Sequence, residues 1–372
     1  MTLRINTLEF RNFRNYEHLR LSDLGEITVL VGRNAIGKTN IIEGVQLLTA
    51  LSSFRHATRE QLIRHGSESA RLEASISDGN RLLDVALTLD SVSRRYQLNG
   101  KGKRPADLKG LVPSVVFTPD DLNLVKGSAT GRRAALDALG SQVNKSYHTV
   151  RLDYEKVIRH KNRLLKEEAD AALVEAVNEM VITVGSQLTC YRAALFARII
   201  PPLVEKYRHI SQNGETLSAV YIPSWDDRAE VGNYPALLDA AIQRDQAREA
   251  LVRALRERAA EERRRGRSVV GAHADKIVFL LDGQDASLYG SQGQQRSIVL
   301  AYKLAEAAVV EELLEQKPVL LLDDVMSELD GVRRAALVEA MERGSQTFIT
   351  TANLAYFDQN MLDRSNVVSL PI

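Results

Sequence analysis

The sequence contains a single cysteine, almost no net charge and no long apolar run. With only Cys190 the chain cannot form an internal disulfide, which fits a reducing compartment; in its apolar helical surroundings this residue is best interpreted as part of the core. No stretch of about 18 uncharged apolar residues occurs, and the amino terminus lacks the apolar segment of a signal peptide. We therefore expect a cytoplasmic protein that does not associate with membranes.

The charges nearly cancel, since 49 Lys and Arg residues stand against 48 Asp and Glu residues. A net charge of +1 produces no strong overall field, so any surface for a polyanion must come from local clusters of Lys and Arg. At 372 residues, of which 44% are hydrophobic, the chain is long enough to form more than one compact unit.

Hydrophobic patterns predict an α/β fold that is interrupted and then resumed. Strands are expected at 3–10, 27–31, 71–77, 82–89 and 112–117, and again at 276–281, 318–324 and 347–351, with helices at 40–51 and 294–315. Between them lie long helical patterns, broken at Pro201 and Pro202. The expected architecture is an α/β domain built from 1–121 and 268–372, with a mostly helical insertion at 122–267 that is too short for a long coiled coil.

A phosphate-binding loop follows the predicted strand 27–31. The segment from Gly32 to Thr39 matches G-x-x-x-x-G-K-[ST] between a strand and a helix, which is the context that this motif requires. The loop N–H groups and the helix N-terminus can donate hydrogen bonds to phosphate oxygens. Lys38 can neutralise the charge of the β- and γ-phosphates of ATP, and Thr39 can bind Mg²⁺. The candidate nucleotide-binding residues here are Gly32, Arg33, Asn34, Ala35, Ile36, Gly37, Lys38, Thr39 and Asn40.

Two aspartates end the apolar strand that begins at Val319. A buried parallel strand presents its carboxyl end where ligands bind, so Asp323 is the second predicted Mg²⁺ ligand, acting through water. Asp324 falls where ABC ATPases carry a catalytic glutamate, and we predict that it activates the attacking water. Asp324 and Lys38 are the two predicted catalytic residues. The alternative for Asp324 is an aspartate that caps a helix or ends a strand.

A third motif opens the predicted helix 294–315. Ser291, Gln292, Gly293 and Gln294 match the ABC signature, with SQGQ in place of SGGQ, and are therefore candidate nucleotide-binding residues. A simple helix N-cap is the alternative interpretation. The segment 327–330 then occupies the position of the D-loop of these ATPases.

Along its whole length the chain resembles the RecF family of bacterial recombination-repair proteins. The resemblance rests on the motifs above and on FRNY (13–16), FTPDDLNLVKG (117–127), VGAHADKI (270–277) and LLLDDVMSELD (320–330). The resemblance implies an ABC-type ATPase head like that of SMC proteins, with a helical second lobe. It also implies an ATP-induced homodimer and weak DNA-dependent ATP hydrolysis. The implied partners are single-stranded, gapped and duplex DNA and the RecR and RecO proteins, in DNA replication, repair and SOS induction.

Some family features are missing or ambiguous. No histidine follows the strand 347–351, so Thr351 and Asn353 are candidates for the γ-phosphate sensor, and Gln61 and the turn 118–121 are candidates for the glutamine loop. His273 and Asp275 are either near a ligand or a structural pair. Basic clusters occur at 101–104, 132–133, 159–163 and 253–267. Each cluster alone is typical of a solvent-exposed face, and in the last of them Glu261 can pair with Arg265 and Arg258 with Glu262. Several such clusters on one surface would instead indicate a DNA-binding surface.

Two other functions share part of this pattern. The nucleotide-binding subunit of an ABC transporter would have the same phosphate motifs and signature, but its switch histidine is missing here and a helical insertion of this size is foreign to it. A small-molecule kinase with a phosphate-binding loop has no need of the segment 291–294.

Overall fold

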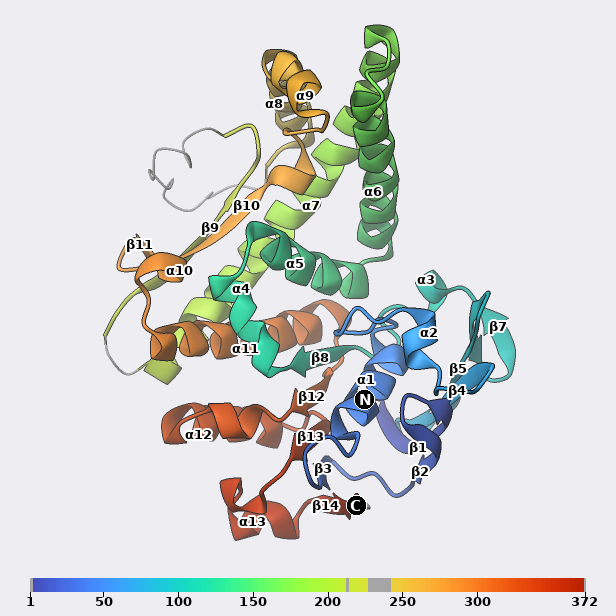
Figure 1. The fold of residues 1–372 in the computed structure, drawn as a ribbon. Helices are drawn as coiled ribbons and strands as arrows, with labels where there is room; N and C mark the ends of the chain where they lie inside the picture. The colour runs from blue at the N-terminus through green and yellow to red at the C-terminus, as the bar shows by residue number, and fades with distance from the viewer. Residues whose placement is uncertain (1–2, 212–213, 227–241, 371–372) are drawn as a thin grey trace. The chain divides into compact units, whose positions relative to one another are not determined.

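The computed structural model describes residues 3–211, 214–226 and 242–370 (Figure 1). The chain forms two compact units. Unit 1 comprises 1–121 and 306–372, and unit 2 comprises 122–305. The boundary at 305 falls within α11 (Gln292–Leu314), whose last residues belong to unit 1.

Unit 1 contains a five-stranded parallel sheet in the order β14-β3-β13-β12-β8. Its strands are β3 (Ile27–Val31), β8 (Ser114–Phe117), β12 (Val319–Asp323), β13 (Thr347–Thr351) and β14 (Asn366–Ser369). The three inner strands and β8 are buried almost throughout, because a parallel sheet is covered on both faces. Their carboxyl ends share one edge of the sheet, so the segments that follow them meet there.

A six-stranded antiparallel sheet in the order β2-β1-β4-β5-β6-β7 forms the other layer of unit 1. Its strands are β1 (Arg4–Phe13), β2 (Tyr16–Leu21), β4 (Ser69–Ser77), β5 (Leu82–Asp90), β6 (Arg94–Leu98) and β7 (Lys101–Lys103). Helix α1 (Lys38–Thr49) contacts strands of both sheets. The contact with β1 is close, since a Cβ at Gly44 would lie 2.5 Å from the Phe10 ring. Phe10, Ile42, Leu321 and Phe348 therefore share one core.

Short helices complete unit 1. They are α2 (Arg59–Leu62), α3 (Pro105–Leu108), η4 (Val325–Glu328), α12 (Gly331–Glu342), η5 (Leu354–Tyr356) and α13 (Gln359–Asp363), and η1 (Pro119–Leu122) leads into unit 2.

Unit 2 is mostly helical. Its helices are α4 (Asn123–Lys126), α5 (Ala129–Val143), α6 (Lys145–Lys166), α7 (Ala171–Ser211), α8 (Arg244–Glu257), α9 (Ala259–Arg265), η3 (Ala272–Ala274), α10 (Ala286–Tyr289) and the start of α11. A small antiparallel sheet in the order β11-β10-β9 accompanies them, formed by β9 (Leu217–Ile222), β10 (Lys276–Leu281) and β11 (Gln284–Asp285).

The observed units differ from the expected division in one place. Residues 268–305, expected with the α/β domain, belong to unit 2. The reason is strand pairing: β10 pairs along its whole length with β9, which lies inside the insertion. Long-range pairing of this kind leaves no mark in the local sequence pattern.

The expected break at Pro201 and Pro202 is wrong, because α7 continues through both residues. Each proline removes a backbone donor, which ordinarily disfavours a helix interior. The side chains of Ile199 and Leu203, on either side of the pair, are completely buried. Packing of this apolar stripe outweighs the lost hydrogen bonds, because tertiary packing supplies most of the stability of a helix in a protein.

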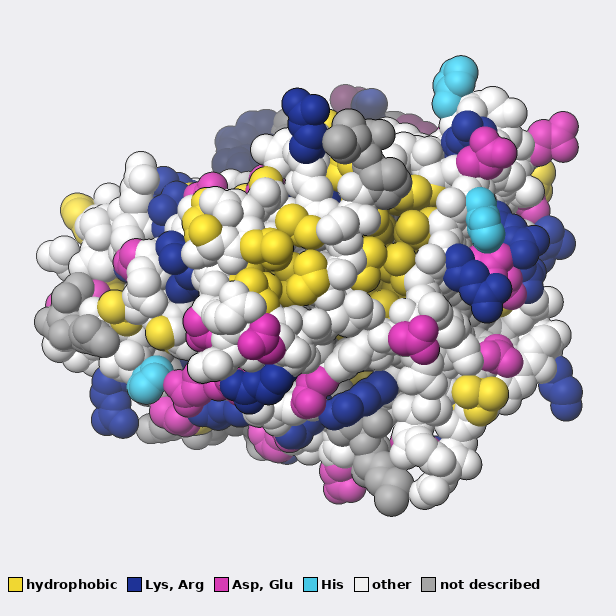
Figure 2. All heavy atoms as spheres, turned by 90° about the horizontal axis from the view of Figure 1, so that it is seen from below, with side chains coloured by type: hydrophobic (Ala, Val, Ile, Leu, Met, Phe, Trp, Pro, Cys, Tyr) yellow, Lys and Arg dark blue, Asp and Glu magenta, His cyan; other side chains and the backbone are white. Residues whose placement is uncertain are grey.

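No helix within the described ranges is long and apolar enough to cross a membrane. On the face shown in Figure 2, Lys and Arg side chains are interspersed with Asp and Glu side chains. The near-zero net charge is therefore reflected in a mixed distribution of charge on that face.

Candidate nucleotide site

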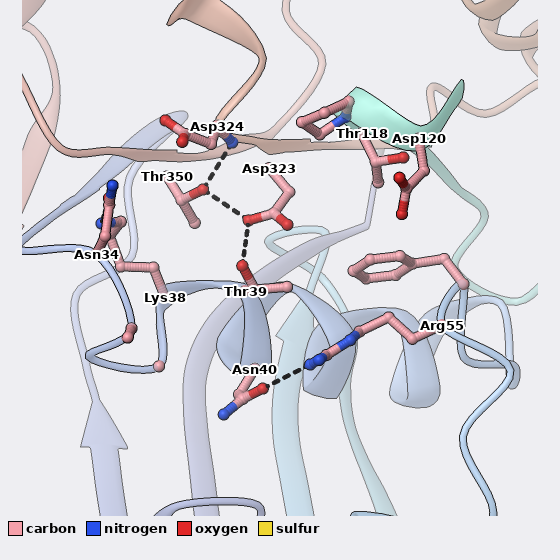
Figure 3. A pocket seen from close by; sticks show the side chains of 14 residues that line it. Asn34, Lys38, Thr39, Asn40, Arg55, Thr118, Asp120, Asp323, Asp324 and Thr350 are labelled. Atoms are coloured by element: carbon pink, nitrogen blue, oxygen red, sulfur yellow. Dashed lines mark hydrogen bonds between the residues drawn. The ribbon is translucent and has the colours of Figure 1, made fainter. Parts of the chain in front are cut away.

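A cavity of about 530 Å³ lies in unit 1 where β3, β8, β12 and β13 end (Figure 3). A cavity of this size falls in the range of small-molecule and cofactor sites. Its lining residues come from the loop after β3, the start of α1 and the ends of the neighbouring strands: Asn34, Ala35, Gly37, Lys38, Thr39, Asn40, Phe54, Arg55, Thr118, Pro119, Asp120, Asp323, Asp324 and Thr350. Of the predicted loop residues, Gly32, Arg33 and Ile36 do not line it.

The loop between β3 and α1 depends on glycine at Gly37. This residue has φ 112°, a left-handed conformation that side chains rarely adopt. A Cβ there would also lie 2.6 Å from the Asn15 side chain and 2.9 Å from the Tyr16 hydroxyl. The loop therefore packs tightly against the turn between β1 and β2, and the first turn of α1 follows it at the cavity.

Lys38 lies almost buried against the loop, with 6% of its surface exposed. Its Nζ donates hydrogen bonds to the carbonyl oxygens of Gly32 at 2.6 Å and Arg33 at 3.0 Å. The ammonium group is therefore held at the cavity by the loop itself.

The Asp323 carboxylate is the centre of a buried hydroxyl cluster. Its Oδ1 accepts hydrogen bonds from Thr39 Oγ1 at 2.9 Å and from Thr350 Oγ1 at 2.8 Å (Figure 3). Burial raises the pKa of the carboxyl above its ordinary value of 3.8, and the hydrogen bonds from Thr350 and Thr39 oppose that shift. The cluster brings the two predicted Mg²⁺ ligands, Thr39 and Asp323, into direct contact.

Asp324 follows with the left-handed backbone angles φ 52° and ψ 27°. Its N–H donates to Thr350 Oγ1 at 2.9 Å, so the same hydroxyl contacts both aspartates. Although Asp324 precedes η4, its side chain makes no capping hydrogen bond, which leaves the capping alternative without support. Burial raises the pKa of its carboxyl and Glu328 adds to this, whereas the Lys38 charge lowers it.

A chain of polar contacts supports the loop from the outside. Asn15 Nδ2 donates to the Ile36 carbonyl at 2.9 Å, and Asn15 Oδ1 accepts from Asn40 Nδ2 at 2.7 Å. Asn40 Oδ1 in turn accepts from Arg55 Nη1 at 2.9 Å, which places the Arg55 guanidinium at the cavity wall (Figure 3). Asn40 therefore contacts the cavity and also fixes two neighbouring residues.

A buried carboxylate completes this support. Glu43 has no exposed surface and accepts two hydrogen bonds from Arg14, both at 2.8 Å, and one from Ser53 at 2.6 Å. The sequence analysis missed Arg55 and its neighbour Phe54 as cavity residues, because no motif marks them and only the return of the chain after α1 places them there.

The signature residues lie in unit 2, at the start of α11. Ser291 Oγ accepts from the Gln294 N–H at 3.2 Å, and Gln294 Oε1 accepts from the Ser291 N–H at 2.6 Å. This reciprocal pair is a capping box, so the N-cap of the alternative interpretation is present. An N-cap of this kind is compatible with nucleotide binding by the same residues. Ser291 and Gln292 are exposed, Gly293 is half-buried, and Gln294 also donates to Glu215 at 3.0 Å.

The candidates for the γ-phosphate sensor and for the glutamine loop fall into two groups, those that line the cavity and those that only bond to neighbouring residues. Thr351 and Asn353 bond to each other in a tight turn, and Gln61 caps α2 through the Thr58 N–H at 2.9 Å. None of these three lines the cavity, whereas Thr118 from the turn 118–121 does. Thr350 lines the cavity and was missed by the sequence analysis; its position at the carboxyl end of β13, beside β12, was the available signal.

Several basic residues that were candidates for DNA contact have structural roles. Arg132 donates to the carbonyls of Val125 at 3.0 Å and Gly127 at 2.9 Å, and Arg133 donates to the carbonyl of Asp275. Burial lowers the pKa of both guanidinium groups. This pair therefore holds α5 in place and is a poor candidate for contacting phosphates.

His273 and Asp275 are not bonded to each other as a pair. His273 Nδ1 lies 2.8 Å from the Tyr154 hydroxyl. Asp275 accepts from Thr189 at 3.1 Å, from the Ser224 N–H at 2.8 Å and from the Tyr221 hydroxyl. Each residue is satisfied by its own partners inside unit 2, which supports the structural interpretation.

Comparisons with known proteins show which family the chain resembles. The family model described as "RecF/RecN/SMC N terminal domain" matches residues 4–369. Proteins described as "DNA replication and repair protein RecF" include one from Thermosynechococcus vestitus, 37% identical over 95% of this chain and 92% of that protein. Another, from Halalkalibacterium halodurans, is 33% identical over 98% and 97%.

Solved structures show the same relationship. The structure of "the recombination mediator protein RecF-ATP in RecFOR pathway" has a TM-score of 0.86 and 27% identity, covering 96% of this chain and 94% of that one. The Smc head domain of Pyrococcus furiosus has a TM-score of 0.53 at 13% identity, a likeness of fold alone. The predicted ABC-type ATPase head fold is confirmed, and the transporter alternative gains no support. The chain therefore belongs to the RecF family of DNA replication and repair proteins.

Proposed function

We propose that this chain is an ATP-dependent DNA-binding protein of recombinational DNA repair, and that ATP binds in the cavity of unit 1. The observation that carries the proposal is the contact of Thr39 and Thr350 with one oxygen of Asp323, beside the nearly buried Lys38. Phosphate-binding loops, a lysine and an acidic strand end together form the nucleotide site of ABC-type ATPases. A solved relative is described in complex with ATP.

The residues present also fit Mg²⁺. A threonine hydroxyl and a carboxylate are hard oxygen ligands, and they already lie 2.9 Å apart. No group of three or more His, Cys, Asp or Glu side chains that could hold a metal ion occurs within the described ranges. Mg²⁺ is normally held by one or two protein ligands together with phosphates and water, so Thr39 and Asp323 suffice. When bound, the ion neutralises charge on the β- and γ-phosphates.

Hydrolysis requires a group that orients and deprotonates water, and we assign this role to Asp324. Its left-handed backbone and its bond to Thr350 hold the residue at the cavity. Lys38 stabilises the negative charge that develops on the phosphates. Aspartate is one carbon shorter than the glutamate of other ABC ATPases, so we expect slow hydrolysis, weakly stimulated by DNA.

The signature and the partners complete the proposal. Ser291, Gln292, Gly293 and Gln294 bind the ATP of a second copy, so that ATP induces a closed two-fold homodimer. This dimer binds single-stranded, gapped and duplex DNA in the cytoplasm, acts with RecR and RecO, and supports DNA replication and SOS induction. The family membership and the solved relative described "in RecFOR pathway" support these assignments.

The first test is the substitution Lys38→Ala. Because the ammonium lies at the cavity, its removal should weaken ATP binding at least about tenfold, or about 1.4 kcal/mol. The thermal unfolding midpoint without nucleotide should change little, since the loop keeps its backbone bonds. Lys103→Ala, at an exposed position on β7, is the matched control and should bind ATP normally. Equal ATP affinity in Lys38→Ala and the wild type would contradict the site.

The second test is DNA binding by the purified protein with ATP, with ADP and without nucleotide. We expect higher affinity with ATP, and a salt dependence that steepens by about 0.9 per additional duplex phosphate contact. DNA affinity that ignores both nucleotide and salt would refute the proposed coupling.

A further inference from the structure

One end of unit 2 carries a cluster of cations on two helices that are locked together. Helix α9 contacts α6, and Lys161 of α6 forms a buried ion pair with Glu262 of α9, Nζ to Oε2, at 2.6 Å. Glu262 Oε1 also accepts from Ser268 Oγ at 2.7 Å and from the Val269 N–H at 2.9 Å. Asn162 accepts from the Ser268 N–H at 2.7 Å. The chain after α9 is thereby fixed to α6.

This lock corrects two expectations about charge. Lys161, expected in a solvated basic cluster, has no exposed surface. Glu262, expected to pair with Arg258, is buried instead, and Arg258 pairs with Glu261 at 3.1 Å. The predicted pair of Arg265 with Glu261 is present at 2.7 Å. Both acidic residues of α9 therefore already form ion pairs, Glu262 with Lys161 and Glu261 with Arg258 and Arg265.

The remaining cations face solvent. On α6, Arg159, Arg163 and Lys166 follow one another at spacings of four and three residues, which places them on one face over about 10 Å. Arg263, Arg264 and Arg267 are exposed on α9 and just beyond it. None of these six forms an ion pair with any carboxylate among the described residues. We name the six the α6–α9 surface.

The chemistry of the α6–α9 surface favours a nucleic acid backbone over a protein partner. Protein interfaces are anchored by apolar and aromatic side chains, and none of the exposed large apolar side chains in the described ranges lies on α6, α8 or α9. Arginine forks match phosphate oxygens, and duplex DNA presents one negative charge per about 1.7 Å of its axis. A locked, arginine-rich and apolar-free face suits such a partner.

We infer that the α6–α9 surface is a contact site of this protein for the phosphate backbone of duplex DNA, without base readout. The inference rests on the proposed function and adds to it a location in unit 2, whereas the nucleotide cavity belongs to unit 1. The buried pair of Lys161 and Glu262 positions α9, and the arginines make the contact. Glu167 and Glu168 follow Lys166 and limit the surface at that end.

The experiment compares two variants that each remove charge from exposed residues of unit 2. The test variant is Arg159→Gln, Arg163→Gln, Arg263→Gln, Arg264→Gln. The control is Arg198→Gln, Arg208→Gln, both on α7. Affinity for a short duplex of mixed sequence is measured with ATP at several salt concentrations, together with ATP affinity and thermal unfolding.

The test variant should lose at least about tenfold in duplex affinity, equally for all sequences, and its salt slope should fall by about 0.9 for each arginine that contacts a phosphate. ATP affinity should be unchanged, and the control should keep wild-type DNA binding. Wild-type duplex affinity in the test variant would overturn the inference while leaving the proposed function intact. So would a lower unfolding midpoint with unchanged DNA affinity, which would mean that the arginines only complement helix ends.

Failure of the proposed function has a different signature. In that case the wild type itself binds duplex without regard to nucleotide, or not at all. The control removes two arginines and the test variant four, so a loss in log affinity that is equal per arginine removed would mean a diffuse charge effect and would also overturn the assignment of this surface.

Discussion

At the scale of single residues, Asp323 combines a structural cost with a proposed role in binding Mg²⁺. The residue is 7% exposed and burial raises the pKa of its carboxyl, which means that the charged form is less favoured here than in water. The two threonine hydroxyls offset part of that cost. Strained or disfavoured groups of this kind are common at functional sites, where stability is given up for activity.

We therefore predict that Asp323→Asn stabilises the protein without nucleotide by about 1 kcal/mol and abolishes Mg²⁺-dependent ATP hydrolysis. The amide oxygen can still accept from Thr39 and Thr350, but it carries no charge for the cation. Asp323→Ala is the control; it leaves both hydroxyls without their acceptor and should lower stability. Thermal unfolding and ATPase assays check both variants, and an Asp323→Asn variant that hydrolyses ATP normally would remove Asp323 from the metal site.

The pH dependence of this stabilisation has a definite sign. A carboxyl whose pKa is raised in the folded state binds its proton more readily there than in the unfolded chain. At neutral pH the ionised carboxylate of Asp323 lowers the free energy of unfolding. This loss of stability decreases as the pH falls through the raised pKa of the folded state, and it is absent at a pH below the ordinary pKa of 3.8. The difference in stability between Asp323→Asn and the wild type should shrink as the pH falls through that window.

Asp324 is expected to act in the chemical step alone. Asp324→Asn should keep ATP affinity within about twofold and slow hydrolysis at least about a hundredfold, because the amide is nearly isosteric but cannot take a proton. Single-turnover hydrolysis and equilibrium ATP binding separate the two effects. Asp358→Asn, at the exposed N-cap of α13, is the matched control and should turn over ATP normally. Normal turnover in Asp324→Asn would move the base elsewhere.

At the scale of elements, the buried ion pair between α6 and α9 decides where the α9 arginines lie. Breaking a buried pair from one side leaves an uncompensated charge and typically costs 3–5 kcal/mol, whereas removing both charges costs much less. Burial lowers the pKa of Lys161, and the charge and hydrogen bond of Glu262 oppose that shift.

Lys161→Met alone should therefore destabilise unit 2 by about 3 kcal/mol or more, and Lys161→Met with Glu262→Gln should recover most of that loss. Glutamine can still accept from Ser268 and Val269, so the turn after α9 keeps its hydrogen bonds. Hydrogen exchange of the α9 amides, with thermal unfolding, measures both effects. Equal losses in the single and double variants would show that the charge pairing itself does not hold α9.

At the scale of the whole molecule, the motifs of the ATPase are divided between the two units. The phosphate loop, Asp323 and Asp324 belong to unit 1, and Ser291 belongs to unit 2. In the proposed dimer the exposed Ser291 of one copy meets the ATP of the other, so dimerisation and ATP binding are separate steps.

Ser291→Arg should consequently bind ATP with wild-type affinity but remain a monomer with ATP, because the bulk blocks closure and not the first binding step. Light scattering measures the mass with and without ATP. Ser91→Arg, on an exposed turn of unit 1, is the matched control and should dimerise. Equal dimerisation of Ser291→Arg and wild type would contradict the role assigned to the signature.

The local sequence was sufficient for elements whose pattern is contained within them. Strand 27–31 coincides with β3, 276–281 with β10 and 347–351 with β13, since each is a short apolar or β-branched run bounded by turn residues. The phosphate loop was recognisable for the same reason, because its glycines and Lys38 are contiguous and their spacing is set by backbone geometry.

What the sequence by itself determined is thus the family, the phosphate-loop motif and the strands that flank it. Only the tertiary structure decided that Thr350 contacts both aspartates, that Arg132 and Lys161 are structural, and that β10 belongs with the insertion. The physical reason is the range of the interactions. Backbone geometry and hydrophobic period act over a few residues and are visible locally, whereas burial and partnership depend on segments distant along the chain that only packing brings together.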